Sequence, residues 1–197
     1  MINDKSIQTL ELQKILEQLA KHCTFSGGGQ LARELTPTTD LEEAQAWQRE
    51  TAEACLLFEN QVNISLGGAR DVRDEAIQAT RGVLIEPQIL LDIRQTLRRA
   101  TTLRRTLGRL KGQYPLLADL VNEAEECASL QEEIGRVLNE KGEVMDSASP
   151  QLATIRRDLK VAYDRLQTRL MRLISSGTNA PYLQEPIITT RNGRYVI

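Results

Sequence analysis

The sequence predicts an all-α helical bundle that carries a long protruding lever helix and a short terminal β-hairpin. Apolar residues recur at the spacing of an amphipathic helix up to about residue 175. Aromatic residues make up only 4% of the chain, so the core must be built from aliphatic side chains, which suits helices packed on helices. Near the C-terminus, Asn192-Gly193 separates two extended runs, which is the strongest short-range signal for a hairpin.

Composition narrows the class of protein. The 197 residues are 41% hydrophobic and 26% charged, which is ordinary for a soluble globular protein. The net charge of −2 gives no global argument for a nucleic-acid partner. No apolar stretch approaches the ~20 residues that span a bilayer, and the N-terminus lacks the layout of a signal peptide. We therefore expect a cytoplasmic protein with no membrane partner.

The sequence offers neither a catalytic nor a metal site. Cys23, Cys55 and Cys127 lie far apart, and His22 is the only histidine, so no cysteine–histidine cluster has the spacing of a zinc site. His22 and Cys23 are neighbours, but adjacent helical residues point about 100° apart and do not face each other. We expect the cysteines to be core residues, with no metal, cofactor or active site in this segment.

The first helices follow from their start signals. An amphipathic stripe runs from Ile7 to Leu19. Gly27-Gly28-Gly29 has neither the preceding strand nor the following Lys-Ser/Thr of a phosphate loop, so a helix break or a weak first turn is favoured. Asp40 with Glu43 resembles a capping box that opens the next helix. We expect Trp47 to anchor this helix in the core, with stacking on a substrate as the alternative.

A second long helix, in the middle of the chain, opens with Pro87 at its first position. It carries a basic side, on which Arg94, Arg98 and Arg105 share one face. Arginines in this arrangement suit phosphate groups. The alternative is a solvated face that pairs with the acidic segment 119–146, and the overall charge balance favours this alternative.

The most clearly marked helix begins at Ser149-Pro150 and runs to about Ser175. Serine suits the N-cap, and proline suits the first helical position. About 25 residues at 1.5 Å per residue span roughly 37 Å, so we expect a stiff rod that leaves the bundle. Its apolar residues are spaced by three and four, as in a coiled-coil seam, with Arg169 as the only interruption; they are Leu152, Ile155, Leu159, Ala162, Leu166 and Leu173.

The end of the chain predicts a hairpin. An extended strand is expected from Tyr182 to Thr190, a turn at Asn192-Gly193, and a second strand that ends at Ile197. A two-stranded hairpin alone is marginally stable in water. We therefore expect the sheet to continue beyond residue 197 and the chain to be a fragment.

Several stretches of the chain, taken together, resemble one family. They are Leu10-Glu11 with Ile15-Leu16, Gly67-Gly68-Ala69-Arg70-Asp71-Val72-Arg73, Tyr114-Pro115-Leu116-Leu117, residues 142–150 running into Ile155-Arg156, and residues 191–197. In this order they resemble the N-terminal part of the bacterial MutS paralogue family that lacks the mismatch-recognition domain, often called MutS-two.

The resemblance implies more than this chain contains. Family members have a helical core with lever helices, a clamp, and an ABC-type ATPase that dimerises, and many add a C-terminal Smr nuclease domain. The intact protein is then expected to bind ATP and Mg²⁺, to form a homodimer, and to act on branched DNA in suppressing recombination or on the rRNA of stalled, collided ribosomes in splitting them. This chain has no loop ending in Gly-Lys-Ser/Thr, so we expect no ATP site in it.

The resemblance divides the chain into a helical core domain (1–148), a long lever helix (149–176) and the start of a truncated β-containing clamp (177–197). The expected role is to couple the ATPase state to the clamp. We expect Arg191 and Arg194, which flank the turn, to contact nucleic-acid phosphates; ordinary solvated charges are the alternative. A second hypothesis is a freestanding helical scaffold that pairs through the seam of residues 152–173.

Overall fold

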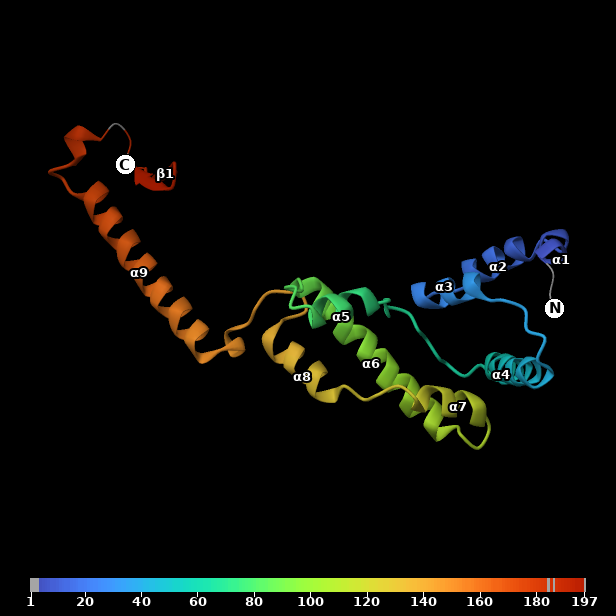
Figure 1. Cartoon of the computed structure of the whole chain (residues 1–197). Coiled ribbons are helices and arrows are strands. Elements are labelled where there is room, and N and C mark those ends of the chain that lie inside the picture. Colours follow the sequence, from blue (N-terminus) through green and yellow to red (C-terminus); the bar gives the residue numbers. More distant parts are fainter. Residues whose placement is uncertain (1–3, 184, 186, 197) are drawn as a thin grey trace. The chain divides into compact units, whose positions relative to one another are not determined.

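The computed structural model describes residues 4–183, 185 and 187–196, and it divides the chain into two units, Met1–Val144 and Met145–Ile197 (Figure 1). The first unit holds α1 (Asp4–Thr9), α2 (Leu12–Lys21), α3 (Ser26–Glu34), α4 (Leu41–Glu59), α5 (Arg73–Thr80), α6 (Pro87–Arg109), α7 (Pro115–Asn122) and α8 (Ala128–Val137). The second holds η1 (Asp146–Ala148), α9 (Pro150–Ser175), η2 (Ala180–Tyr182), β1 (Thr189–Arg191) and β2 (Arg194–Val196).

The predicted helical class with a terminal hairpin is confirmed. In the described residues, helices dominate both units, and β1 and β2 form one antiparallel two-stranded sheet. The second unit contains both the predicted lever helix and the described part of the predicted clamp. The three-part division and the protrusion of the lever helix stay predictions.

The first amphipathic stripe is two helices rather than one. Glu11 has a left-handed backbone with a φ of 52°, which interrupts the helical hydrogen bonds between α1 and α2. The predicted continuous helix from Ile7 to Leu19 is therefore wrong. α2 packs against α3 and buries Leu16 and Ala20. The glycines at 27–29 lie in the first turn of α3, where the sequence predicts a first turn rather than a phosphate loop; the weakness of this turn stays a prediction.

Asp40 caps α4 as predicted. Its Oδ1 accepts hydrogen bonds from the backbone N–H groups of Glu42 at 2.8 Å and Glu43 at 3.2 Å. The reciprocal half of the capping box is different, because the Glu43 carboxylate accepts from the Thr38 hydroxyl. The Asp40 N–H donates to that same hydroxyl at 3.1 Å. Thr38 thus links the two groups that a capping box would join directly.

The core of the first unit joins α4, α6 and α7. Leu57, Leu107, Tyr114 and Ala118 form one buried cluster, in which Tyr114 is 1% exposed. The Tyr114 hydroxyl accepts a hydrogen bond from the Asn60 side-chain amide at 2.8 Å. A buried phenol needs such a partner, and this contact fixes the end of α4 against the start of α7.

Two interpretations of burial are wrong. Trp47 is 41% exposed rather than a core anchor. The residues that meet α7 and the residue before it lie C-terminal to Trp47; they include Leu57 of α4 and Asn60, which directly follows α4. Cys23 and Cys55 are exposed, and Cys127 is half-buried. Apolar spacing identified one side of each helix, but a side is buried only where another element covers it.

α9 begins and ends as predicted. The Ser149 hydroxyl accepts a hydrogen bond from the Leu152 N–H at 3.0 Å, and Pro150 is the first helical residue. The seam positions Ile155 and Leu159 are 55% and 67% exposed.

The first strand is shorter than predicted. The Tyr182 N–H donates to the Asn179 carbonyl at 3.0 Å in the 3₁₀ turn η2, and β1 begins only at Thr189. The predicted strand from Tyr182 is therefore wrong in its first part. Gln184 and Pro186 of that strand, and Ile197 of the second, lie outside the described residues.

Candidate nucleic-acid interface

The hairpin turn has the backbone that the Asn-Gly pair predicts. Asn192 and Gly193 have φ values of 50° and 73°, so both central residues are left-handed, as a type I′ turn requires. The turn fixes the register of the strands, in which Arg191 lies directly opposite Arg194 and Thr190 opposite Tyr195. Residues directly opposite each other point to the same face, so the two predicted site residues share one face of the hairpin.

Tyr195 ties the other face of the hairpin to α9. Its hydroxyl is hydrogen-bonded to Tyr163, and this bond raises the pKa of Tyr195 above the usual 10.0. Gln167, one turn along, donates to the Tyr163 hydroxyl at 3.1 Å. Because successive strand residues alternate between faces, Arg191 and Arg194 lie on the face that is turned away from this contact.

Among the described residues, no acid neutralises either arginine of the hairpin. Both side chains are exposed, and no ion pair joins either of them to a described residue. Like charges directly opposite each other in a hairpin repel. Whether these two residues bind nucleic acid stays a prediction, but the pair is accessible and its repulsion falls when an anion binds between them.

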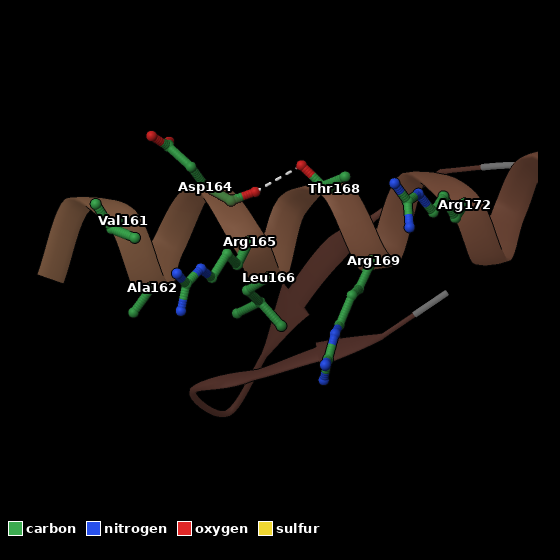
Figure 2. A pocket seen from close by; sticks show the side chains of 8 residues that line it. All are labelled: Val161, Ala162, Asp164, Arg165, Leu166, Thr168, Arg169 and Arg172. Atoms are coloured by element: carbon green, nitrogen blue, oxygen red, sulfur yellow. Dashed lines mark hydrogen bonds between the residues drawn. The ribbon is translucent and has the colours of Figure 1, made fainter. Parts of the chain in front are cut away.

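A second basic surface was missed by the sequence reasoning. Arg165, Arg169 and Arg172, here called the arginine stripe, line an open groove of about 660 Å³ along α9 together with Thr168 and neighbouring residues (Figure 2). A spacing of four and then three residues puts the three side chains on one helix face. The sequence shows this spacing, but the apolar pattern of the seam identifies Arg169 only as its interruption.

Charge is unevenly divided between the two units. Residues 145–197 contain eight basic and four acidic residues, a net charge of +4, whereas residues 1–144 contain 17 basic and 23 acidic residues, a net charge of −6. The overall charge of −2 conceals this difference. A positive region of this kind attracts polyanions even in a protein whose total charge is negative.

The basic face of α6 is not a continuous exposed surface. Arg98 and Arg105 are exposed, but the guanidinium of Arg94 packs against Gly135 of α8, where an added Cβ would lie 2.3 Å from its Nη2. Pairing with the acidic segment occurs through other residues of the same region: Arg104 lies 3.6 Å from Glu126, and Lys111 lies 2.6 Å from Asp119. This arrangement favours the alternative of a solvated, paired face over a phosphate site.

The described residues contain no group of histidine, cysteine and carboxylate side chains arranged to hold a metal ion. A search of the same residues for a helix long and apolar enough to cross a membrane also finds none.

Comparison with known proteins finds several relatives that share one name. No family model matches the chain. Proteins named Endonuclease MutS2 from Symbiobacterium thermophilum and Thermomicrobium roseum are each 38% identical, over 196 and 194 residues, which is 100% and 97% of this chain and 24% of each relative. The one from Alkaliphilus oremlandii is 33% identical over 198 residues, 100% of this chain and 25% of the relative. The chain thus spans about a quarter of the length of these relatives. Along its whole length the chain is homologous to a segment of the MutS2 proteins, which confirms the family that its sequence resembles.

Proposed function

We propose that this chain is the non-catalytic core and lever segment of a MutS-like, ATP-dependent nucleic-acid-binding protein. In this proposal α9 transmits the nucleotide state of an ATPase to a clamp, and the hairpin is the beginning of that clamp. ATP, Mg²⁺ and the homodimer belong to the intact protein. The name of the relatives, Endonuclease MutS2, supports a nucleic-acid substrate.

One observation carries the proposal: Arg191 and Arg194 lie opposite each other on an exposed face with no acidic partner among the described residues. Two arginines held in this way suit a phosphodiester group, because guanidinium forks bind phosphate oxygens in pairs. The net charge of +4 on residues 145–197 adds attraction over a longer range.

Fluorescence anisotropy of the 197-residue chain with a labelled four-way DNA junction tests the proposal. We expect weak binding that falls steeply with salt, and we expect Arg191→Gln/Arg194→Gln to lower the slope of log K against log salt by about 1 to 2, because each phosphate contact contributes about 0.9. The chain should hydrolyse no ATP above background. Tight binding that does not respond to salt would contradict this role.

The substrate of the intact protein is proposed to be branched DNA or the rRNA of stalled ribosomes. Competition of the DNA junction by an unbranched duplex and by an rRNA stem-loop separates these substrates. Preference for the junction supports the recombination role, and preference for the stem-loop supports ribosome splitting. Co-sedimentation of the full-length protein with ribosomes then tests the second role directly.

The exposed seam of α9 favours a second candidate, a scaffold that pairs through residues 152–173. Leu159 and Leu173 are 67% and 49% exposed, which is unusual for apolar residues at coiled-coil spacing. Size-exclusion chromatography with light scattering tests this candidate. A tight dimer that dissociates with Leu159→Glu supports the scaffold, whereas a monomer that this substitution leaves unchanged supports the lever.

A further inference from the structure

We propose that the arginine stripe of α9 is a second phosphate-binding surface, separate from the hairpin pair, and that its occupant is the backbone of duplex DNA. This inference rests on the proposed function, because both assume that the protein binds a nucleic acid. It assigns binding to Arg165, Arg169 and Arg172, which lie outside the hairpin.

The two halves of α9 differ in how their arginines are neutralised. In the N-terminal half, Arg156 lies 2.7 Å from Asp146, and Arg157 lies 3.7 Å from Asp158. In the C-terminal half, all three members of the arginine stripe are exposed, and none forms an ion pair with a described residue. Asp164 precedes the stripe and lines the same groove, but no ion pair joins it to the stripe in the described residues. No further acidic residue occurs from position 165 to position 184.

The shape of the stripe suits a straight polyanion. At 1.5 Å per residue, the seven-residue step from Arg165 to Arg172 spans roughly 10 Å along one side of a rigid helix. Duplex DNA carries one charge per about 1.7 Å of its axis, so a segment of this length presents several phosphates.

The groove beside the stripe is open to such a ligand. Figure 2 shows Arg165 and Arg169 extending from the same side of α9, while the carboxylate of Asp164, which also lines the groove, extends from the opposite side. The Thr168 hydroxyl donates to the Asp164 carbonyl at 2.8 Å, which keeps this hydroxyl on the helix surface.

The stripe and the hairpin pair are different surfaces. At about 100° per residue, each arginine of the stripe lies about 120° or more around α9 from both Tyr163 and Gln167. These two residues form the contact with Tyr195 of the hairpin. Arg191 and Arg194 lie on the hairpin face turned away from that contact, so the two sets of arginines do not converge on one phosphate.

The test measures binding of a labelled duplex DNA of about 20 base pairs to the whole chain by anisotropy, between about 50 and 200 mM salt, the range in which phosphate contacts dominate affinity. The stripe variant is Arg165→Gln/Arg169→Gln/Arg172→Gln. The matched control, Arg49→Gln/Arg81→Gln/Arg109→Gln, removes three exposed arginines of the first unit. The variant Arg165→Lys/Arg169→Lys/Arg172→Lys keeps the charge, and circular dichroism checks that every variant retains its helices.

We expect the glutamine stripe variant to lower the salt slope by about 2 to 3 and to weaken binding roughly eightfold per lost contact at 0.1 M salt. The control should change the affinity less than threefold, and the lysine variant should keep most of the slope. The effect should add to that of Arg191→Gln/Arg194→Gln, since the two surfaces are separate.

Loss of binding with the hairpin variant but not with the stripe variant would overturn this inference and leave the proposed function standing. Loss of binding with the stripe variant but not with the hairpin variant supports the stripe and removes the hairpin from the proposed function. An equal loss with the control would overturn the site in favour of general charge. Binding of an RNA duplex more than tenfold tighter than the DNA duplex would overturn the assigned occupant, and absence of any binding at low salt would overturn both proposals.

Discussion

Glu53 of α4 caps helix α7 at Leu116. Its carboxylate accepts the backbone N–H of Leu116 at 3.0 Å and that of Leu117 at 3.1 Å. These N–H groups belong to the first turn of α7 and have no partner within the helix. The cap therefore comes from a residue 63 positions earlier in the chain, and it joins α4 to α7 beside the buried Tyr114.

We expect Glu53→Ala to lower the free energy of unfolding by about 1 to 3 kcal/mol, because it leaves two half-buried N–H groups without a charged acceptor. Urea denaturation followed by circular dichroism measures this loss. Glu59→Ala, an exposed glutamate of the same helix, is the control and should change the value by less than about 0.5 kcal/mol. Equal effects of the two substitutions would show that the cap contributes nothing.

Alanine substitutions at two neighbouring glycines in the first turn of α3 should have different effects on stability. A Cβ at Gly27 would lie 2.6 Å from Cε1 of Phe25, whereas a Cβ at Gly28 would have its nearest neighbours at 3.9 Å. Gly28→Ala should therefore raise the stability by up to about 1 kcal/mol, the usual difference in helix propensity. Gly27→Ala should gain nothing or lose stability, because the ring must move. Thermal unfolding of both variants checks this, and an equal gain would contradict the tight contact.

Arg94 leaves no space for a side chain at Gly135 of α8. An added Cβ would lie 2.3 Å from Nη2 and 2.6 Å from Cζ of this arginine, whose buried Nε has no hydrogen-bond partner in the described part of the chain. Gly135→Ala should lower the free energy of unfolding by about 1 kcal/mol or more through overpacking. Gly108→Ala in α6, where a Cβ meets open space, is the matched control and should stabilise.

A double-mutant cycle identifies the cause. If Arg94 is the obstacle, Gly135→Ala should cost less in a chain that also carries Arg94→Ala, with a coupling of at least about 0.5 kcal/mol. Strictly additive changes would rule out the contact.

The contact between Tyr195 and α9 should weaken at high pH. The hydrogen bond to Tyr163 raises the pKa of Tyr195, so the neutral phenol is favoured in the folded hairpin. Its contribution to stability is fully present below pH 10.0, the usual pKa, and is lost as the pH rises through the higher folded value. NMR titration of labelled tyrosines should show a Tyr195 midpoint above 10.0 that moves back toward this value in Tyr163→Phe. A midpoint that this substitution leaves unchanged would contradict the contact.

Features that depend on neighbouring residues were predictable from the sequence. Examples are the Asp40 and Ser149 caps, the glycines at the start of α3 and the Asn192-Gly193 turn. Each of these depends only on residues within a few positions along the chain. The register that sets Arg191 opposite Arg194 follows from the same turn. The predicted site pair was therefore available from sequence, although its binding role is a proposal.

The arginine stripe shows the opposite case. The spacing can be seen in the sequence, but only the structure distinguishes Arg156 and Arg157, which form ion pairs, from Arg165, Arg169 and Arg172 of the same helix. The latter three are exposed and form no ion pair with a described residue. Ion pairing depends on which acids lie within reach in space, and helical periodicity carries no such information.

The sequence by itself determined the helical class, the start of α9, the terminal turn and the family. Tertiary structure alone decided which helix sides are covered: Trp47 and two of the cysteines are exposed, Arg94 is packed on Gly135, and Glu53 caps a helix 63 positions away. The reason is physical. Caps and turns are satisfied by local hydrogen bonds, whereas burial and long-range capping require a second element to arrive at the same place.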